Sequence, residues 1–148
     1  MPSIIPSYVY SLFATLIVGA ILVGGITMET ANIRNQAVTQ QLSNLDEYVA
    51  TQSMALATRA VETGQNTTLY LDIPSQVANQ VYWVALVNGQ SGAQVTSGLG
   101  STAVLSDQDG VAIPAEVSVS GFYCSSDGRA FLQCSVENQT VDLTLMGV

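Results

Sequence analysis

The chain has 148 residues, which is enough for one small domain with an extended segment. Its 11 acidic residues against three arginines give a net charge of −8, which argues against a nucleic-acid partner because phosphates attract cations. Histidine, the commonest general base and metal ligand, does not occur in the sequence. We therefore expect no enzyme activity, no catalytic residue, no metal site and no cofactor.

The main feature of the sequence is an apolar run from Ile4 to Met28 that contains no charged residue. As a helix, this run is long enough to cross the hydrocarbon core of a bilayer, which is about 30 Å thick. It must lie in lipid or among other helices, because burying its side chains is worth on the order of tens of kcal/mol. No basic residue precedes the run and the first one after it is Arg34. We therefore expect a mature chain from which a basic leader has been removed.

Small residues within the run are spaced for close contact between helices. Ala20 and Gly24 stand four residues apart, and such faces let two backbones approach when lipid and protein are equally apolar. The alternative is a monomeric anchor with ordinary glycine content. We assign the polymerisation surface to these residues: Ile4, Ile5, Phe13, Leu16, Ile17, Gly19, Ala20, Gly24 and Gly25.

An amphipathic pattern follows the apolar run. Apolar residues recur at the spacing of one helical face, namely Val38, Leu42, Leu45, Val49, Leu56 and Ala60. No proline lies between Pro6 and Pro74, so we predict one helix over residues 3–62 that Gly64 ends. We interpret its charged residues as solvated, or as pairing between neighbouring helices in the case of Glu29 and Arg34; the solvated ones are Asp46, Glu47 and Glu62.

After Gly64 the period changes from helical spacing to alternation, which is typical of strands. Turn residues separate the predicted strands, which cover residues 67–73, 81–87, 93–97, 102–105, 111–113, 116–121, 122–124, 130–136 and 140–146. The predicted fold class is α+β, with a long N-terminal helix followed by a small all-β, sandwich-like head. The helix domain covers residues 1–63, apolar over 4–28 and amphipathic over 29–63, and the head covers residues 64–148.

Two cysteines and two glycosylation motifs lie in the predicted head. Cys124 and Cys134 are close in sequence, and in an exported protein we expect them to form a disulfide between adjacent strands. The alternative is two buried free thiols. Asn66 and Asn138 begin Asn-x-Thr motifs and are candidate N-glycosylation sites.

The order of these segments resembles archaeal type IV pilins and the related archaellins. The resemblance is carried by SYVYSLFATLIVGAILVGGI and TANIRNQAVTQQLSNLDEYVATQSMAL, so it is specific only over residues 1–60. It implies that a prepilin-type peptidase removes a leader and that a membrane platform and an ATPase extract the subunits from the bilayer. It also implies a filament with a core of N-terminal helices and an outer wall of β heads. Bacterial type IV pilins have glutamate at the fifth mature position, where this chain has Ile5, and archaeal members commonly lack that acid.

The expected function is that of a major pilin in an extracellular archaeal pilus used for adhesion or motility. Its expected partners are copies of itself, with a membrane location before assembly. Three alternatives remain open at this point: an archaellum subunit, a membrane-anchored accessory protein whose head binds the cell envelope, and a surface-tethered sugar-binding module.

Overall fold

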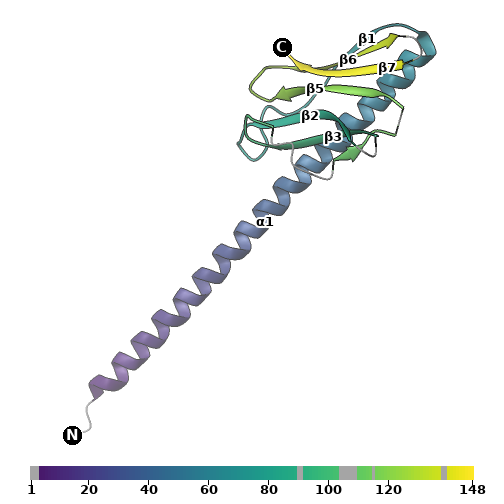
Figure 1. Cartoon of the computed structure of the whole chain (residues 1–148). Coiled ribbons are helices and arrows are strands. Elements are labelled where there is room, and N and C mark those ends of the chain that lie inside the picture. The colour runs from purple at the N-terminus through teal and green to yellow at the C-terminus, as the bar shows by residue number, and fades with distance from the viewer. Residues whose placement is uncertain (1–3, 90–91, 104–109, 115, 138–139) are drawn as a thin grey trace. The chain divides into compact units, whose positions relative to one another are not determined.

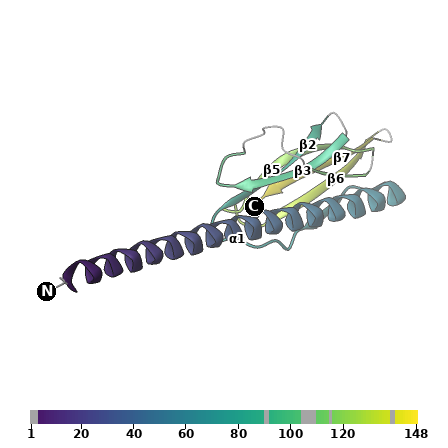
Figure 2. The same cartoon turned by 90° about the horizontal axis from the view of Figure 1, so that it is seen from below.

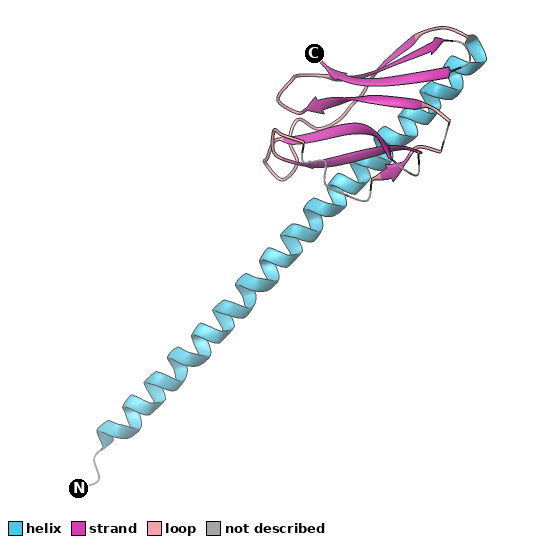
Figure 3. Cartoon of the chain, viewed as in Figure 1, coloured by secondary structure: helices cyan, strands magenta, loops and turns pink. Residues whose placement is uncertain are grey.

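The computed structural model describes residues 4–89, 92–103, 110–114, 116–137 and 140–148. One helix precedes all the strands (Figure 1, Figure 3). The elements are α1 (Ile4–Thr63), β1 (Thr67–Tyr70), β2 (Tyr82–Gly89), β3 (Gly92–Leu99), β4 (Val111–Ala112), β5 (Ser118–Cys124), β6 (Ala130–Glu137) and β7 (Thr140–Gly147). The α+β class is confirmed. The chain forms two compact units, Met1–Ala37 and Val38–Val148, and the boundary falls inside α1.

Helix α1 runs for 60 residues without interruption, close to the predicted range. It ends where the sequence predicts, because Gly64 has a positive φ of 64° and its N–H donates to the Ala60 carbonyl at 2.8 Å. Glycine adopts this left-handed conformation without the penalty that a Cβ brings, and it satisfies a carbonyl that the end of a helix leaves open.

The strands form a single mixed sheet in the order β1-β6-β7-β5-β2-β3-β4 (Figure 1). Neighbouring strands are antiparallel except β5 and β7, which run parallel from Ser118 opposite Asp142 to Gly121 opposite Leu145. The predicted segments 116–121 and 122–124 merge into one strand, β5, which begins at Ser118. Residues 102–103 are not in a strand, and the rest of the predicted strand 102–105 lies outside the described residues.

The apolar stripe of α1 covers one face of this sheet in the Val38–Val148 unit (Figure 2). The stripe is buried or half-buried as the spacing predicts, with Val49 and Ala60 fully covered. From the sheet, alternate residues of β7 enter the same core, namely Val141, Leu143 and Leu145. The head was expected to be sandwich-like. Its second layer is the helix, because the stripe offers the apolar face that a second sheet would otherwise supply.

A smaller apolar cluster lies on the opposite face of the sheet. Trp83 follows Tyr82 in β2, and because strand residues alternate between faces, the two fully buried rings point to opposite sides. The Trp83 indole lies over Gly98, where an added Cβ would come within 2.7 Å of the ring. Phe122 stacks beside it, with ring centroids 6.5 Å apart. Glycine at position 98 is therefore required by the close approach of the indole.

The predicted disulfide between Cys124 and Cys134 is wrong, because both residues are buried free thiols. Cys124 lies on β5 and Cys134 on β6, and β7 lies between these strands. Strands that are not neighbours are about 10 Å apart, whereas a disulfide needs Cα atoms within about 7 Å. The two thiols also occupy different faces, since Cys134 belongs to the core under α1 while Cys124 lies opposite Trp83. The prediction assumed that a short loop joins adjacent strands.

Candidate functional site: the apolar surface of Ile4–Met28

The apolar run is open to its surroundings over residues 8–28. Every residue from Tyr8 to Met28 is exposed, including Leu16 at 61% and Ile21 at 68%. The part of α1 from Tyr8 onward passes the length and hydropathy criteria for crossing a membrane, with a mean hydropathy of 2.2 in its apolar window. Contiguous apolar surface of this extent marks contact with a membrane or with protein. An apolar helix near the N-terminus therefore indicates membrane insertion or secretion.

One face of this segment combines aromatic and aliphatic residues with small ones. Phe13, Ile17, Ala20 and Gly24 follow one another at spacings of four, three and four residues, which places them within about 60° around the helix axis. Phe13 is 57% exposed and Ile17 is 58% exposed. Together the four residues form a stripe, which we call the small-residue stripe. No part of the described chain covers it.

The glycines leave room for close approach by another helix. A Cβ placed on Gly19, Gly24 or Gly25 would meet no atom within 4 Å. Gly19 lies on one side of the small-residue stripe and Gly25 on the other. Leu16, which is also exposed, lies on the same side as Gly19. The predicted residues are thus spread over more than one face of the helix. Ile4 and Ile5 lie in its first turn, and their side chains are outside the described part.

Two hydroxyl groups of the segment, those of Thr15 and Thr27, are satisfied within the helix. Thr15 Oγ1 donates to the carbonyls of Ser11 at 3.1 Å and Leu12 at 2.9 Å. Thr27 Oγ1 donates in the same way to the Gly24 carbonyl at 2.9 Å. In lipid or in a dry helix bundle, a polar group needs such an internal partner. These threonines can therefore leave water without losing their hydrogen bonds.

The two sequon asparagines have different outcomes. Asn66 lies exposed between α1 and β1, and its Oδ1 accepts a hydrogen bond from the Val136 N–H at 3.2 Å. This bond links the segment between α1 and β1 to strand β6. Asn138 lies outside the described residues. Glycosylation of either residue stays a prediction.

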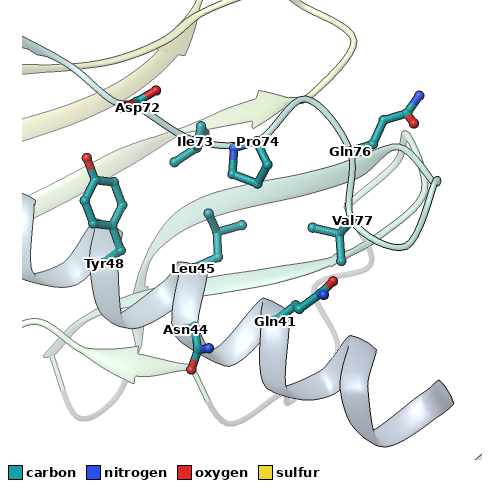
Figure 4. Close-up of a pocket in the computed structure, with 9 residues that line it drawn as sticks. All are labelled: Gln41, Asn44, Leu45, Tyr48, Asp72, Ile73, Pro74, Gln76 and Val77. Carbon is teal, nitrogen blue, oxygen red and sulfur yellow. The ribbon is translucent and has the colours of Figure 1, made fainter. Parts of the chain in front are cut away.

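A groove of about 370 Å³ lies in the head unit between α1 and the segment after β1 (Figure 4). Its lining is mostly carboxamide and apolar, with one phenol and one carboxylate: Gln41, Asn44, Leu45, Tyr48, Asp72, Ile73, Pro74, Gln76 and Val77. Among the described residues no group of three or more His, Cys, Asp or Glu side chains could hold a metal ion. The groove can offer polar contacts, but it offers no nucleophile with a base beside it.

Asp46 was interpreted as a solvated helix charge, and this is wrong. It is only 9% exposed and faces the sheet, whereas Glu47 and Glu62 are exposed as expected. Burial raises the pKa of Asp46 to about 6, and the nearby Ser97 hydroxyl of β3 partly offsets the rise. Asp46 Oδ1 and Ser97 Oγ nevertheless lack a well-formed hydrogen bond among the described residues. The signal was present in the sequence, because position 46 lies four residues after Leu42 and three before Val49, inside the apolar stripe.

No protein-family model, no curated protein and no solved structure matches the chain. The architecture itself is pilin-like, with a long apolar N-terminal helix followed by a β-sheet head.

Proposed function

We propose that the chain is the major pilin of an extracellular archaeal type IV pilus and that it polymerises through Ile4–Met28. The observation that carries the proposal is the exposed, uncharged surface of residues 8–28 with its open small-residue stripe. Its partners are then copies of the same chain, and it resides in the membrane before assembly. The resemblance to archaeal pilins adds an assembly platform and an ATPase as further partners.

The small-residue stripe favours helix neighbours over lipid as the final surroundings. Lipid and protein are about equally apolar, so burial alone does not decide between them. Packing decides between them. No atom lies within 4 Å of a Cβ placed on Gly24, so another helix can approach the backbone closely here and pack better than mobile lipid chains do.

The composition of the head fits a structural role on the outside of a filament better than a catalytic role. The sequence has no histidine or lysine, and we propose that the chain is not an enzyme and does not bind nucleic acid. Only 9% of its residues are charged, so the surface is largely uncharged and polar. Few charged groups limit the number of like-charge contacts between copies, although the net charge of −8 opposes their association.

An archaellum subunit would use the same helix surface, so it stays the nearest alternative. A membrane-anchored accessory protein with an envelope-binding head is the second, because a helix of this length also spans a bilayer. Shearing the native cells separates the polymer from the anchor. We expect the chain in the sheared fraction as filaments, identified by electron microscopy and by mass spectrometry of the filament band. Its presence only in detergent-extracted membranes would contradict the proposal. A swimming defect on deletion would favour the archaellum.

A further inference from the structure

The Met1–Ala37 unit carries only two charged side chains, Glu29 and Arg34. The next charged residue along the chain is Asp46. Both Glu29 and Arg34 are exposed, and neither has an ion-pair partner among the described residues. Two opposite charges thus stand alone immediately after a long uncharged run.

Glu29 and Arg34 cannot pair with each other on one helix. They are five residues apart, which separates them by about 140° around the axis and about 7.5 Å along it. Ion pairs on a helix surface need a spacing of three or four residues. Arg59 and Glu62, further along α1, have that spacing and are also exposed. The spacing of Glu29 and Arg34 therefore directs each charge to a group outside its own helix.

We infer that Glu29 of one copy of this chain binds Arg34 of an adjacent copy that points the same way. The inference rests on the proposed function, because in a filament the segment just after the apolar run is enclosed by other helices. An unpaired charge is far more costly there than in water, whereas a pair with good geometry offsets much of that cost. A second copy supplies both complementary charges at this level of the chain. The partner is therefore a second copy.

The positions of the two charges also fit a contact between parallel helices. Residues five apart flank such a contact on either side, as the g and e positions of a coiled coil do, so Glu29 of one copy can meet Arg34 of its neighbour across it. The pair limits the axial offset between the two copies to the reach of the two side chains. The pair thus selects the register along the polymer.

Charge reversal tests the inference in the full chain, with sheared filament yield as the measurement. Glu29→Arg and Arg34→Glu alone should each lower the yield by about tenfold or more, because each places like charges together. Both reversals in one chain restore complementary charges between copies and should return the yield to near that of the unchanged chain. The matched control is Arg59→Glu with Glu62→Arg, singly and together, and these should assemble normally.

A cross-link gives a second measurement if a reversed chain fails to insert in the membrane. Cells that express Glu29→Cys copies together with Arg34→Cys copies should yield a disulfide-linked dimer, with the buried native thiols blocked during unfolding. Either variant expressed alone should yield none. Normal yield from the single reversals, or a double reversal as defective as the singles, would overturn the inference. If the unchanged chain forms filaments but the double reversal does not, only the Glu29–Arg34 contact is contradicted. If no variant and not even the unchanged chain forms filaments, the proposed function is contradicted as well.

Discussion

The side chain of Asn88 forms two hydrogen bonds with the backbone of Val119. Its Nδ2 donates to the Val119 carbonyl at 3.0 Å, and its Oδ1 accepts from the Val119 N–H at 3.1 Å. Backbone pairing between β2 and β5 covers only Trp83–Ala85 opposite Phe122–Cys124. Beyond it, Gly121 has a positive φ of 115° and the strands no longer pair directly. The carboxamide of Asn88 replaces a peptide group and continues the connection between the two halves of the sheet.

Replacing Asn88 should weaken the head measurably. We expect Asn88→Ala to lower the free energy of unfolding by about 1–2 kcal/mol, because both polar groups of Val119 lose their partner. Urea unfolding of the detergent-solubilised chain, followed by Trp83 fluorescence, measures this. The control is Gln133→Ala, an exposed residue in β6, which should change stability by less than about 0.5 kcal/mol. Equal curves for the two variants would show that the Asn88 bonds do not hold β2 to β5.

Asp46 should make the head less stable as pH rises from about 4 to 6. Its folded pKa of about 6 lies above the usual value of 3.8, so the folded state holds the proton more tightly than the unfolded state does. The free energy of unfolding therefore falls across this window, and the loss is complete above it.

Asp46→Asn removes this dependence, since asparagine does not ionise. At pH 7.5 we expect the variant to be more stable than the unchanged chain by up to about 3 kcal/mol, and near pH 4 we expect the two to converge. Glu47→Gln, at the exposed neighbouring position, is the control and should have no such pH-dependent effect. An Asp46→Asn chain that is less stable at pH 7.5 would mean that the carboxylate has a partner that stabilises its charge.

Reductant should leave the stability of the head unchanged, because the two cysteines are not bridged. Burial, with a smaller contribution from the negative charge of Asp142, raises the pKa of the Cys134 thiol and keeps it protonated at neutral pH. We expect two titratable thiols per chain after unfolding under non-reducing conditions. If the chain instead had no free thiols, and its free energy of unfolding dropped by about 2–4 kcal/mol in reductant, the two cysteines would form a disulfide after all.

Gly24→Leu should prevent assembly but not membrane insertion. A leucine here fills the small-residue stripe and keeps neighbouring backbones apart, yet it makes the segment no less apolar. We expect at least about a tenfold loss of sheared filaments at an unchanged membrane level, since a few kcal/mol per contact suffices for this. Val23→Leu, about 100° away on the same helix, is the control. Normal filaments from Gly24→Leu would remove the stripe from the contact.

The elements could be predicted from the sequence because each one has a clear period. The stripe from Val38 to Ala60 fixed one face of a helix, and Gly64 marked its end. Alternation located most of the strands within a few residues. The exposed apolar run could also be identified, because no pairing within the chain is needed to recognise it.

The order of the strands could not be predicted, since alternation specifies which residues form strands but not which strands are neighbours. The parallel insertion of β7 beside β5 separates Cys124 from Cys134, and no local signal announces it. The predicted strand over residues 81–87 ends before Asn88, although β2 runs on to Gly89 and the Asn88 side chain binds Val119. Such contacts depend on partners about 30 residues away in sequence.

Helical reconstruction of sheared filaments tests the central claim most directly. The account predicts filaments built of this chain, in which residues 4–28 of each copy lie along the axis against the same segment of its neighbours. The β-sheet heads should face outward. Filaments whose core lacks this segment, or native cells in which the chain exists only as a monomer in the bilayer, would contradict the account.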